Sequence, residues 1–556
     1  MHSMSPPPGT PASPGRKRLA PIIQGLRTRL GQWWRSRPSN WLERLVDLAG
    51  IVIGVGWLVV LFLPHLKLIS QPGPQEYNEP SIWQVTFMLD HGRNPYTADE
   101  LPGAAMCFSP LYNFVVLAFK PLFGIDYPAH RMVNLLFFAA SLWLLVRWMR
   151  RAGASLGIAL LSMALYYWMC LDNIMMTARP DNLGFFFFLL ALFVPWENNY
   201  SRWPSIFGLV CAVVAFQCKF YFALAGCATL LGVFFVRSRG EAVRLGFEYF
   251  AALILSVLIF NLYFPFYFIE TVTIQFEAAV LNSNDGISVM HTLMFFERTW
   301  PFLLVLLGGV GAWLWRRHTA RRTGAPALLP GSEAWYGEMR FRMLGSVFLI
   351  YLALVYFYMG RNGGGYFTYH LHLLYPLIFV LAALMLRRPW HRVVVGLLLA
   401  VFVMRLLDVP DKPDAAGPYR RLEQLIFNSK GEILGIPCTT DIFARTSRRV
   451  LHDGSSMFLG FALARDRADR DPLAAIILKK FDEVEQEAKR KVAAREYEMV
   501  LTEFDAPMYC DEALLKKNYD KVEQVDYYTY FGHSPVRVWR PKPQEPDAGA
   551  PPAAGK

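Results

Sequence analysis

Long apolar stretches recur along most of this chain and are separated by short polar turns. A helix that crosses the ~30 Å hydrocarbon core of a bilayer needs about 20 mostly apolar residues. The stretches that approach this length lie near 45–64, 129–146, 154–171, 182–196, 204–218, 220–236, 245–267, 299–315, 343–359, 369–386 and 392–408. The pattern therefore predicts an α-helical polytopic membrane protein with about eleven transmembrane helices.

The basic residues indicate which ends of these helices face the cytoplasm. Lys and Arg collect before the first stretch, in "RWMRR" (Arg147 to Arg151), in "RSRGEAVR" and in "RRPWHR". Cytoplasmic loops carry an excess of Lys and Arg, so these segments are expected inside, together with the N-terminus. This assignment splits residues 204–236 into a hairpin at "FQCKFY". A single unsplit helix there would reverse the orientation of everything downstream.

One apolar segment, 108–124, is predicted to lie in the outer membrane interface instead of crossing it. It is short and is interrupted by Pro110, Lys120 and Pro121. The next span ends in the basic run at Arg147, which belongs inside, and a crossing at 108–124 would place that run outside. We therefore expect a juxtamembrane helix in the first outer loop.

The composition divides the chain into four parts. Residues 1–40 are Pro-rich and basic and are expected to form a disordered cytoplasmic tail, followed by the transmembrane domain at 41–408. Residues 409–540 combine a helical charge pattern ("LKKFDEVEQEAKRKVAAREYE") with strand-like pieces ("YEMVLTEF", "PVRVWRP"), which predicts a small extracytoplasmic α/β domain. The tail at 541–556 is expected to be disordered.

Composition and cysteine usage agree with a membrane protein. The chain is 54% hydrophobic and 18% charged, against about 25% charged in typical soluble domains. The net charge of +12 follows from basic cytoplasmic loops and does not point to nucleic acid. The seven cysteines show no zinc spacing. Cys438 and Cys510 could form one disulfide if the C-terminal part is extracytoplasmic, and this pairing stays open.

The predicted topology brings several ionisable residues to the outer face. They are Glu76 and Glu79 in the first outer loop, Arg179 and Asp181 in "TARPDN", and Lys219 at the tip of the hairpin. An ion near the bilayer centre costs about 2.5–3.5 kcal/mol on insertion scales, so such groups pair or serve a site. The alternatives are a solvated loop acid for Glu79, a structural ion pair for Arg179 and Asp181, and a snorkelling side chain for Lys219.

Acids and cations gathered in this way suit the attack on a sugar that is linked through phosphate. A carboxylate can take the proton from an acceptor hydroxyl. Arg and Lys can hold the departing phosphate as its charge grows. A lipid-linked donor would place its phosphate at headgroup level, which explains a site at the membrane surface.

Several stretches together resemble one family over about residues 45–390. They are "YNEPSIWQVTFMLDHGRNPY", "FSPLYNFVVLAFKPLFG" with "HRMVNLL", "ARPDNLGFFFFLLAL", "VVAFQCKFYFALAG" and "GGGYFTYHLHLLYPL". Their order and sidedness resemble the GT-C-type membrane glycosyltransferases, within the bacterial group related to protein O-mannosyltransferases and lipid A aminoarabinose transferases. The resemblance implies a GT-C-like fold in the bacterial inner membrane. It also implies inverting transfer of a sugar from a polyprenyl-phosphate donor to a hydroxyl on a lipid, glycan or protein.

The resemblance also implies roles for single residues. Glu79 would be the base, with Glu76 in reserve, and Glu79→Gln is then expected to abolish transfer and leave folding intact. Several relatives have Asp-Glu where this chain has Asn78-Glu79, so the role of Glu79 is an inference, and Asn78 would orient the acceptor. The further candidates are Asp181 as a catalytic or pocket residue, Arg179 and Lys219 for donor phosphate, and Tyr366, Tyr369 and His370 for sugar or phosphate.

The sequence indicates no metal site, and a divalent cation remains an option that no acidic cluster demands. His370 and His372 are two residues apart, so on a helix they point in different directions. The rival functions are an O-antigen or oligosaccharide ligase, a transporter or flippase of lipid-linked sugars, and a non-catalytic assembly subunit. A ligase is expected to carry a large late outer loop rich in Arg and His, and a transporter is expected to show inverted repeats, and the sequence shows neither.

Overall fold

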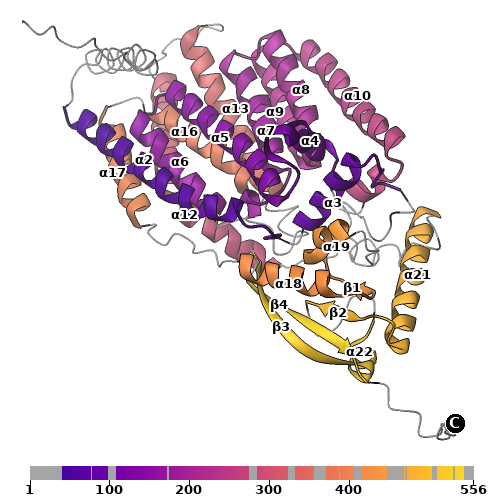
Figure 1. Cartoon of the computed structure of the whole chain (residues 1–556). Helices are drawn as coiled ribbons and strands as arrows, with labels where there is room; N and C mark the ends of the chain where they lie inside the picture. Colours follow the sequence, from indigo (N-terminus) through magenta and orange to yellow (C-terminus); the bar gives the residue numbers. More distant parts are fainter. Residues whose placement is uncertain are drawn as a thin grey trace, which may run out of the picture.

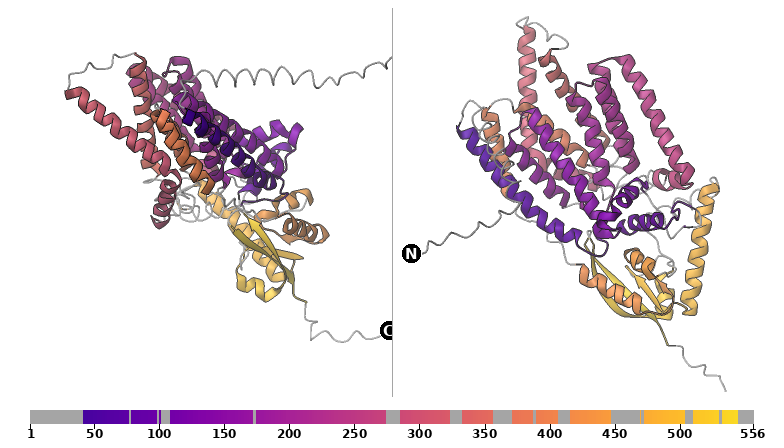
Figure 2. Two further views of the ribbon diagram at one scale, coloured as in Figure 1. Left: turned by 90° about the vertical axis from the view of Figure 1, so that its left-hand side faces the viewer. Right: turned by 45° about the horizontal axis from the view of Figure 1, so that its top comes forward.

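The structure is a computed structural model that describes residues 41–76, 78–97, 100, 108–171, 174–273, 285–322, 332–355, 371–386, 389–405, 415–446, 469, 472–503, 510–529 and 532–543. The predicted tail at 1–40 and residues 544–556 of the predicted tail at 541–556 lie outside these residues, whereas strand β4 extends to Pro541. Within them the chain forms a large bundle of helices with a small mixed sheet at one end (Figures 1 and 2).

The helices of the bundle coincide with the predicted apolar stretches. They are α2 (Trp41–Ile69), α5 (Tyr127–Ala152), α6 (Leu156–Leu171), α7 (Asp181–Glu197), α8 (Arg202–Cys218), α9 (Leu224–Val236), α10 (Arg239–Tyr263), α12 (Asp285–Arg322), α13 (Glu333–Leu354), α16 (Leu374–Met385) and α17 (Pro389–Arg405). Four described segments are long and apolar enough to cross a membrane, namely α2, α5, α10 and Leu293–Gly311 within α12. The chain is therefore a multi-pass membrane protein, and which shorter helices also cross remains a prediction.

The predicted hairpin at 204–236 is present. Helix α8 ends at Cys218, Lys219 adopts an extended backbone conformation, and a 3-10 turn, η3 (Phe220–Ala223), leads into α9. Helices α8 and α9 contact each other along the bundle. The break at Lys219 thus keeps the alternation of helices on which the predicted sidedness depends.

Two short helices lie between α2 and α5, in the segment predicted to be the first outer loop. They are α3 (Glu79–Asp90) and α4 (Leu111–Phe123). Helix α4 has 13 residues and contains Pro121, and no 3-10 turn among the described residues extends it as η3 and η7 (Leu371–Leu373) extend α9 and α16. At a rise of about 1.5 Å per residue it is about 20 Å long, well short of a ~30 Å core. It packs against α3 and α5, and Lys120 on α4 forms an ion pair of 2.5 Å with Asp90 on α3. This agrees with the predicted juxtamembrane helix.

The C-terminal part contains a four-stranded sheet of order β1-β2-β4-β3. Its strands are β1 (Ile433–Leu434), β2 (Met499–Thr502), β3 (Tyr519–Thr529) and β4 (Gly532–Pro541), with β1 and β2 parallel and the other pairs antiparallel. The accompanying helices are α18 (Ala416–Asn428), α19 (Thr440–Thr446), α21 (Pro472–Ala494) and α22 (Glu512–Asn518). The strand-like sequences "YEMVLTEF" and "PVRVWRP" contain all of β2 and the last seven of the ten residues of β4.

The possible disulfide between Cys438 and Cys510 is absent. Both thiols are free and buried. Cys438 packs in the cluster with Tyr419 and Ile442, whereas Cys510 packs in a second cluster with Val492 and Trp539. The two cysteines lie in separate parts of the hydrophobic core of this domain, and each acts there as a packing residue.

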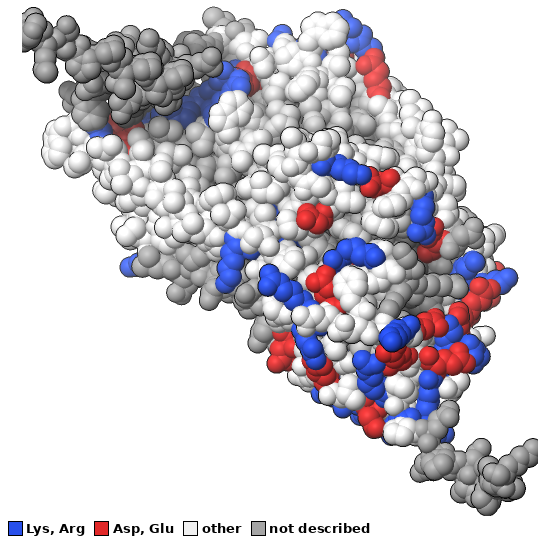
Figure 3. All heavy atoms as spheres, viewed as in Figure 1, with Lys and Arg blue, Asp and Glu red and all other residues white. Residues whose placement is uncertain are grey.

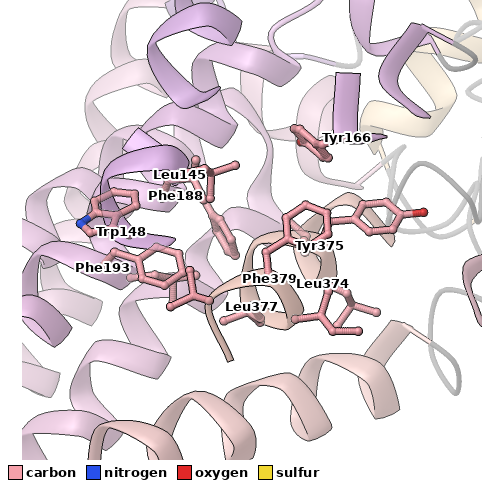
Figure 4. Close-up of a cluster of buried hydrophobic side chains, with 14 of the residues drawn as sticks. Leu145, Trp148, Tyr166, Phe188, Phe193, Leu374, Tyr375, Leu377 and Phe379 are labelled. Atoms are coloured by element: carbon pink, nitrogen blue, oxygen red, sulfur yellow. The ribbon is translucent and has the colours of Figure 1, made fainter. Parts of the chain in front are cut away.

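Surface charge separates the two parts of the molecule. In the view of Figure 3, most of the surface over the helices is uncharged, whereas acidic and basic side chains crowd the C-terminal part. Side chains such as Phe247, Leu258 and Leu262 on α10 are more than half exposed, as expected of a face that contacts lipid. Inside the bundle, aromatic residues including Trp148, Phe188 and Tyr375 fill the core (Figure 4).

The predicted topology can be tested with two exposed positions. Among the described residues, five helices of the bundle separate Gly240, in the first turn of α10, from Val522, which is 56% exposed on β3. If all five cross, the two positions lie on opposite sides of the membrane. We expect a membrane-impermeant maleimide to label Val522→Cys in intact cells and Gly240→Cys only after lysis, with the wild type as background. Labelling of both on one side would contradict the predicted crossings.

Candidate active site

The loop between α2 and α3 carries both candidate acids, and Arg131 holds it in place. Arg131 lies in the first turns of α5 and is fully buried. Its Nη1 donates to the carbonyl oxygens of Leu68 (3.2 Å) and Gln71 (2.7 Å), and its Nη2 donates to that of Gly73 (2.7 Å). A guanidinium offers five N–H groups in a rigid fork, so these bonds determine the path of the loop.

Glu79 completes the coordination of Arg131. Its carboxylate accepts from Arg131 Nε at 2.9 Å and Nη2 at 2.6 Å, and from the backbone N–H groups of Gln75 and Ala178, both at 2.5 Å. The side chain has no exposed surface. Four donors occupy a carboxylate that has about four acceptor positions. This geometry gives Glu79 a structural role, and the alternative of a solvated loop acid does not apply.

Glu76 lies three residues earlier and makes a different set of contacts. Its carboxylate accepts from the backbone N–H and side-chain Nδ2 of Asn78, both at 3.0 Å, and from Nη1 of Arg179 at 2.9 Å. Burial raises the pKa of Glu76, and the neighbouring Glu79 charge raises it further, whereas Arg179 and the Asn78 N–H lower it. Asn78 therefore orients Glu76 in this structure.

Asp181 joins the two candidate cations. Arg179 Nε lies 2.9 Å from Asp181 Oδ2, and Lys219 Nζ lies 2.8 Å from Asp181 Oδ1. Glu76, Arg179, Asp181 and Lys219 thus form an alternating acid–base array, which we call the charged array. All four residues are buried, with at most 8% of their surface exposed. Lys219 is consequently not a snorkelling side chain.

An aromatic ring supports both cations of the array. The guanidinium of Arg179 lies 5.2 Å and the ammonium of Lys219 lies 4.8 Å from the centre of the Phe108 ring. Cations within about 6 Å of a ring face are attracted to it. Phe108 immediately precedes α4, so the juxtamembrane region forms one wall of the site.

Two amide side chains hold the turn that carries Arg179. Asn134 Nδ2 donates to the carbonyls of Met175 (2.7 Å) and Thr177 (2.6 Å), and Asn182 Nδ2 donates to that of Met175 (2.9 Å). Both asparagines are buried. They supply hydrogen bonds to backbone carbonyl groups, and burying these groups without a hydrogen bond would cost free energy. The turn from η2 (Ile174–Met176) into α7 is thus rigidly attached to α5.

Further polar residues near Lys219 were not singled out by the sequence. Gln217 Oε1 accepts from Tyr267 Oη at 2.6 Å and from Ser109 Oγ at 3.3 Å, and Gln217 Nε2 donates to Ser256 Oγ at 2.8 Å. The only sequence signal was a polar residue in the apolar segment "VVAFQCKFY". Arg131 lies in the stretch "HRMVNLL" that contributes to the family resemblance, but its pairing with Glu79 was not predicted.

The structure does not locate the three candidate residues in the stretch "GGGYFTYHLHLLYPL". Tyr366, Tyr369 and His370 lie outside the described residues. His372 is described and is buried, with Nδ1 3.7 Å from Cys170 Sγ and its ring edge-on to Tyr166 and Tyr375 (Figure 4 shows both tyrosines). Among the residues described, no group of three or more His, Cys, Asp and Glu side chains could hold a metal ion.

Comparison with known proteins finds similar solved structures of low sequence identity. No protein-family model matches the chain, and no curated protein matches it. The structure is similar to the crystal structure of ArnT from Cupriavidus metallidurans in the apo state, with 14% identity, a TM-score of 0.41 and coverage of 80% of each chain. It is also similar to ArnT from Cupriavidus metallidurans bound to undecaprenyl phosphate, with 14% identity and a TM-score of 0.40, covering 87% of this chain and 97% of that one.

The contacts of Glu79 predict that its replacement disturbs folding. Glu79→Gln leaves the Arg131 guanidinium buried without its counter-charge, and loss of one partner of a buried pair costs about 3–5 kcal/mol. We expect a large decrease in melting temperature and in the yield of monodisperse protein in detergent. Glu100→Gln is the matched control, because it removes a glutamate from a pair whose Arg93 side chain is 55% exposed. Equal melting temperatures for both variants would contradict the structural role of Glu79.

Proposed function

We propose that this protein is a membrane glycosyltransferase that moves a sugar from a polyprenyl-phosphate-linked donor to an acceptor hydroxyl at the extracytoplasmic face, with inversion. The observation that supports the proposal is the charged array, in which two acids and two cations meet at helix ends that the predicted topology puts on the extracytoplasmic side. The resemblance of the surrounding sequence to GT-C enzymes supplies the class of donor. The acceptor hydroxyl belongs to a lipid, a glycan or a protein.

We assign the role of general base to Glu76 instead of Glu79. The Glu79 carboxylate is occupied by Arg131 and two backbone N–H groups, so it has no position left for a substrate proton. Glu76 has one cationic partner, Arg179, and its raised pKa makes the ionised form a stronger proton acceptor. Asp181 is the reserve candidate, because it contacts both cations.

The proposed reaction is a single displacement at the anomeric carbon. Glu76 takes the proton of the acceptor hydroxyl as its oxygen attacks. The new bond forms between this oxygen and the anomeric carbon, on the face opposite the phosphate. The bond from the anomeric carbon to the phosphate oxygen breaks, and its electron pair leaves with the polyprenyl phosphate. One attack from the opposite face inverts the configuration.

Arg179 and Lys219 are the groups that would stabilise the leaving phosphate. Charge-assisted hydrogen bonds from Arg and Lys strengthen as the phosphate oxygen gains charge. In the structure both cations contact carboxylates, so donor binding would redirect them from Glu76 and Asp181. Because Arg179 lowers the pKa of Glu76, moving Arg179 to the phosphate would raise that pKa further. Donor binding would thus strengthen the base.

The first test of this function compares the wild type with Glu76→Gln. The purified proteins receive polyprenyl-phosphate sugars and candidate acceptors, and mass spectrometry measures released polyprenyl phosphate. General-base catalysis contributes about 10²–10⁴-fold, so we expect folded Glu76→Gln to lose at least about a hundredfold in rate. Its melting temperature should fall less than that of Glu79→Gln, because Arg179 keeps Asp181 as a partner. Glu100→Gln serves as the active control. Full activity of Glu76→Gln would remove Glu76 as the base.

The pH dependence of the wild-type rate provides a second test of Glu76 as the general base. Transfer requires ionised Glu76, so the rate should fall as pH decreases through its pKa. Because burial raises this pKa, the acid limb should lie above the ordinary range of a glutamate. An acid limb at or below that range would contradict the role of Glu76. A folded wild type that releases no polyprenyl phosphate from any donor would contradict the proposed function itself.

A further inference from the structure

The C-terminal domain directly contacts the loop that carries Glu76. Tyr527, fully buried on β3, donates a hydrogen bond from its hydroxyl to the carbonyl oxygen of Pro74. Tyr419 on α18 covers the neighbouring residue, since a Cβ added to Gly73 would lie 2.3 Å from Cδ2 of the Tyr419 ring. Tyr419 and Tyr527, which are more than 100 positions apart in the sequence, thus contact the same loop. Pro74 in this loop lies two residues before Glu76.

A second layer ties this contact to the helix bundle. The Tyr419 hydroxyl donates to Asp441 on α19, and Asp441 Oδ2 also lies 3.2 Å from Nη2 of Arg445. The Tyr127 hydroxyl, at the start of α5, lies 3.5 Å from Asp441 Oδ1. Helix α19 also packs against α3. The domain therefore rests on the same two helices that anchor the loop.

The loop is consequently held from both sides. Arg131 binds the carbonyl of Gly73 from the helix bundle at 2.7 Å, and Tyr527 binds the next carbonyl, that of Pro74, from the C-terminal domain. Gly73 has no room for a side chain, because a Cβ there would collide with the Tyr419 ring. Figure 1 shows the sheet and α18 directly beneath the end of the bundle where α3 lies.

We propose that the C-terminal domain positions the Glu76 carboxylate for catalysis through Tyr527 and Tyr419, which clamp residues 73 and 74 against Arg131. This inference rests on the proposed function for its catalytic consequence, but the clamp itself is a property of the fold. Tyr527 and Tyr419 are positioning residues, because they act on the loop and do not contact a reacting group. A displacement of about 1 Å in such a support can cost up to about a hundredfold in rate.

The decisive variant is Tyr527→Phe, which removes the hydroxyl and keeps the ring. The matched control is Tyr497→Phe, because Tyr497 is buried in the same domain and its hydroxyl has no hydrogen-bond partner among the described residues. A second variant, Gly73→Ala, pushes the Tyr419 ring from the loop with a single methyl group. All three are made in the full chain and purified in detergent.

Hydrogen exchange followed by mass spectrometry measures the clamp without any substrate. The backbone N–H groups of Gln75 and Asn78 donate to the carboxylates of Glu79 and Glu76, so they report on the loop directly. Loss of one hydrogen bond should speed exchange of this segment about five- to tenfold in Tyr527→Phe. Gly73→Ala should have the same effect, and Tyr497→Phe should match the wild type. Unchanged exchange of this segment in both Tyr527→Phe and Gly73→Ala would overturn the proposed clamp.

Kinetics measures the catalytic consequence. With an active donor, Tyr527→Phe should lower kcat about tenfold, since a misplaced base affects the chemical step, and leave KM within about twofold. An unchanged kcat beside faster exchange would overturn the positioning role. If the wild type releases no polyprenyl phosphate, the proposed function is contradicted. Faster exchange in Tyr527→Phe and Gly73→Ala would still support the clamp.

Discussion

The arrangement of the helix ends that carry the charged array depends on one buried ion pair, between Arg131 and Glu79. Burying an ion costs several kcal/mol unless its charge and its hydrogen-bonding groups are satisfied. Here the guanidinium is satisfied by Glu79 and by three carbonyls of the α2–α3 loop, and the carboxylate by two further N–H groups. One of these N–H groups belongs to Ala178, so the same pair connects the first outer loop to the turn before α7.

This constraint places the charged array. The α2–α3 loop carries Glu76 and the turn before α7 carries Arg179 and Asp181, and both segments are attached to the Arg131–Glu79 pair. Lys219 joins them from the break between α8 and α9. The array is balanced, with two acids and two cations, which makes its burial tolerable. A phosphate that enters must displace carboxylates from the cations, and in our account this exchange prepares Glu76 for its role as base.

Much of this arrangement could be predicted from the sequence. Apolar length and basic residues predicted the helices of the bundle, the hairpin at Lys219 and the juxtamembrane position of 108–124. Sidedness alone placed Glu76, Glu79, Arg179, Asp181 and Lys219 on one face, and the structure brings these residues together. Local sequence patterns were sufficient here because a helix in the hydrocarbon core of a membrane must be predominantly apolar along its length.

The pairing of the acids could not be predicted in this way. Glu76 and Glu79 lie in one short loop, and only the tertiary contact with Arg131, 52 residues later in the chain, separates a structural acid from a catalytic candidate. The contact of Tyr527 with Pro74 joins residues 453 positions apart. The possible Cys438–Cys510 disulfide failed for the same reason, because sequence does not reveal which part of the domain core each cysteine enters.

The central claim is that the charged array binds the phosphate of a lipid-linked donor. A cryo-electron microscopy structure of the protein with bound polyprenyl phosphate tests it most directly. We predict that the phosphate lies within hydrogen-bond distance of both Arg179 and Lys219 and that the contact between Arg179 and Glu76 is broken. A phosphate bound elsewhere, with the array still closed on itself, would contradict the account.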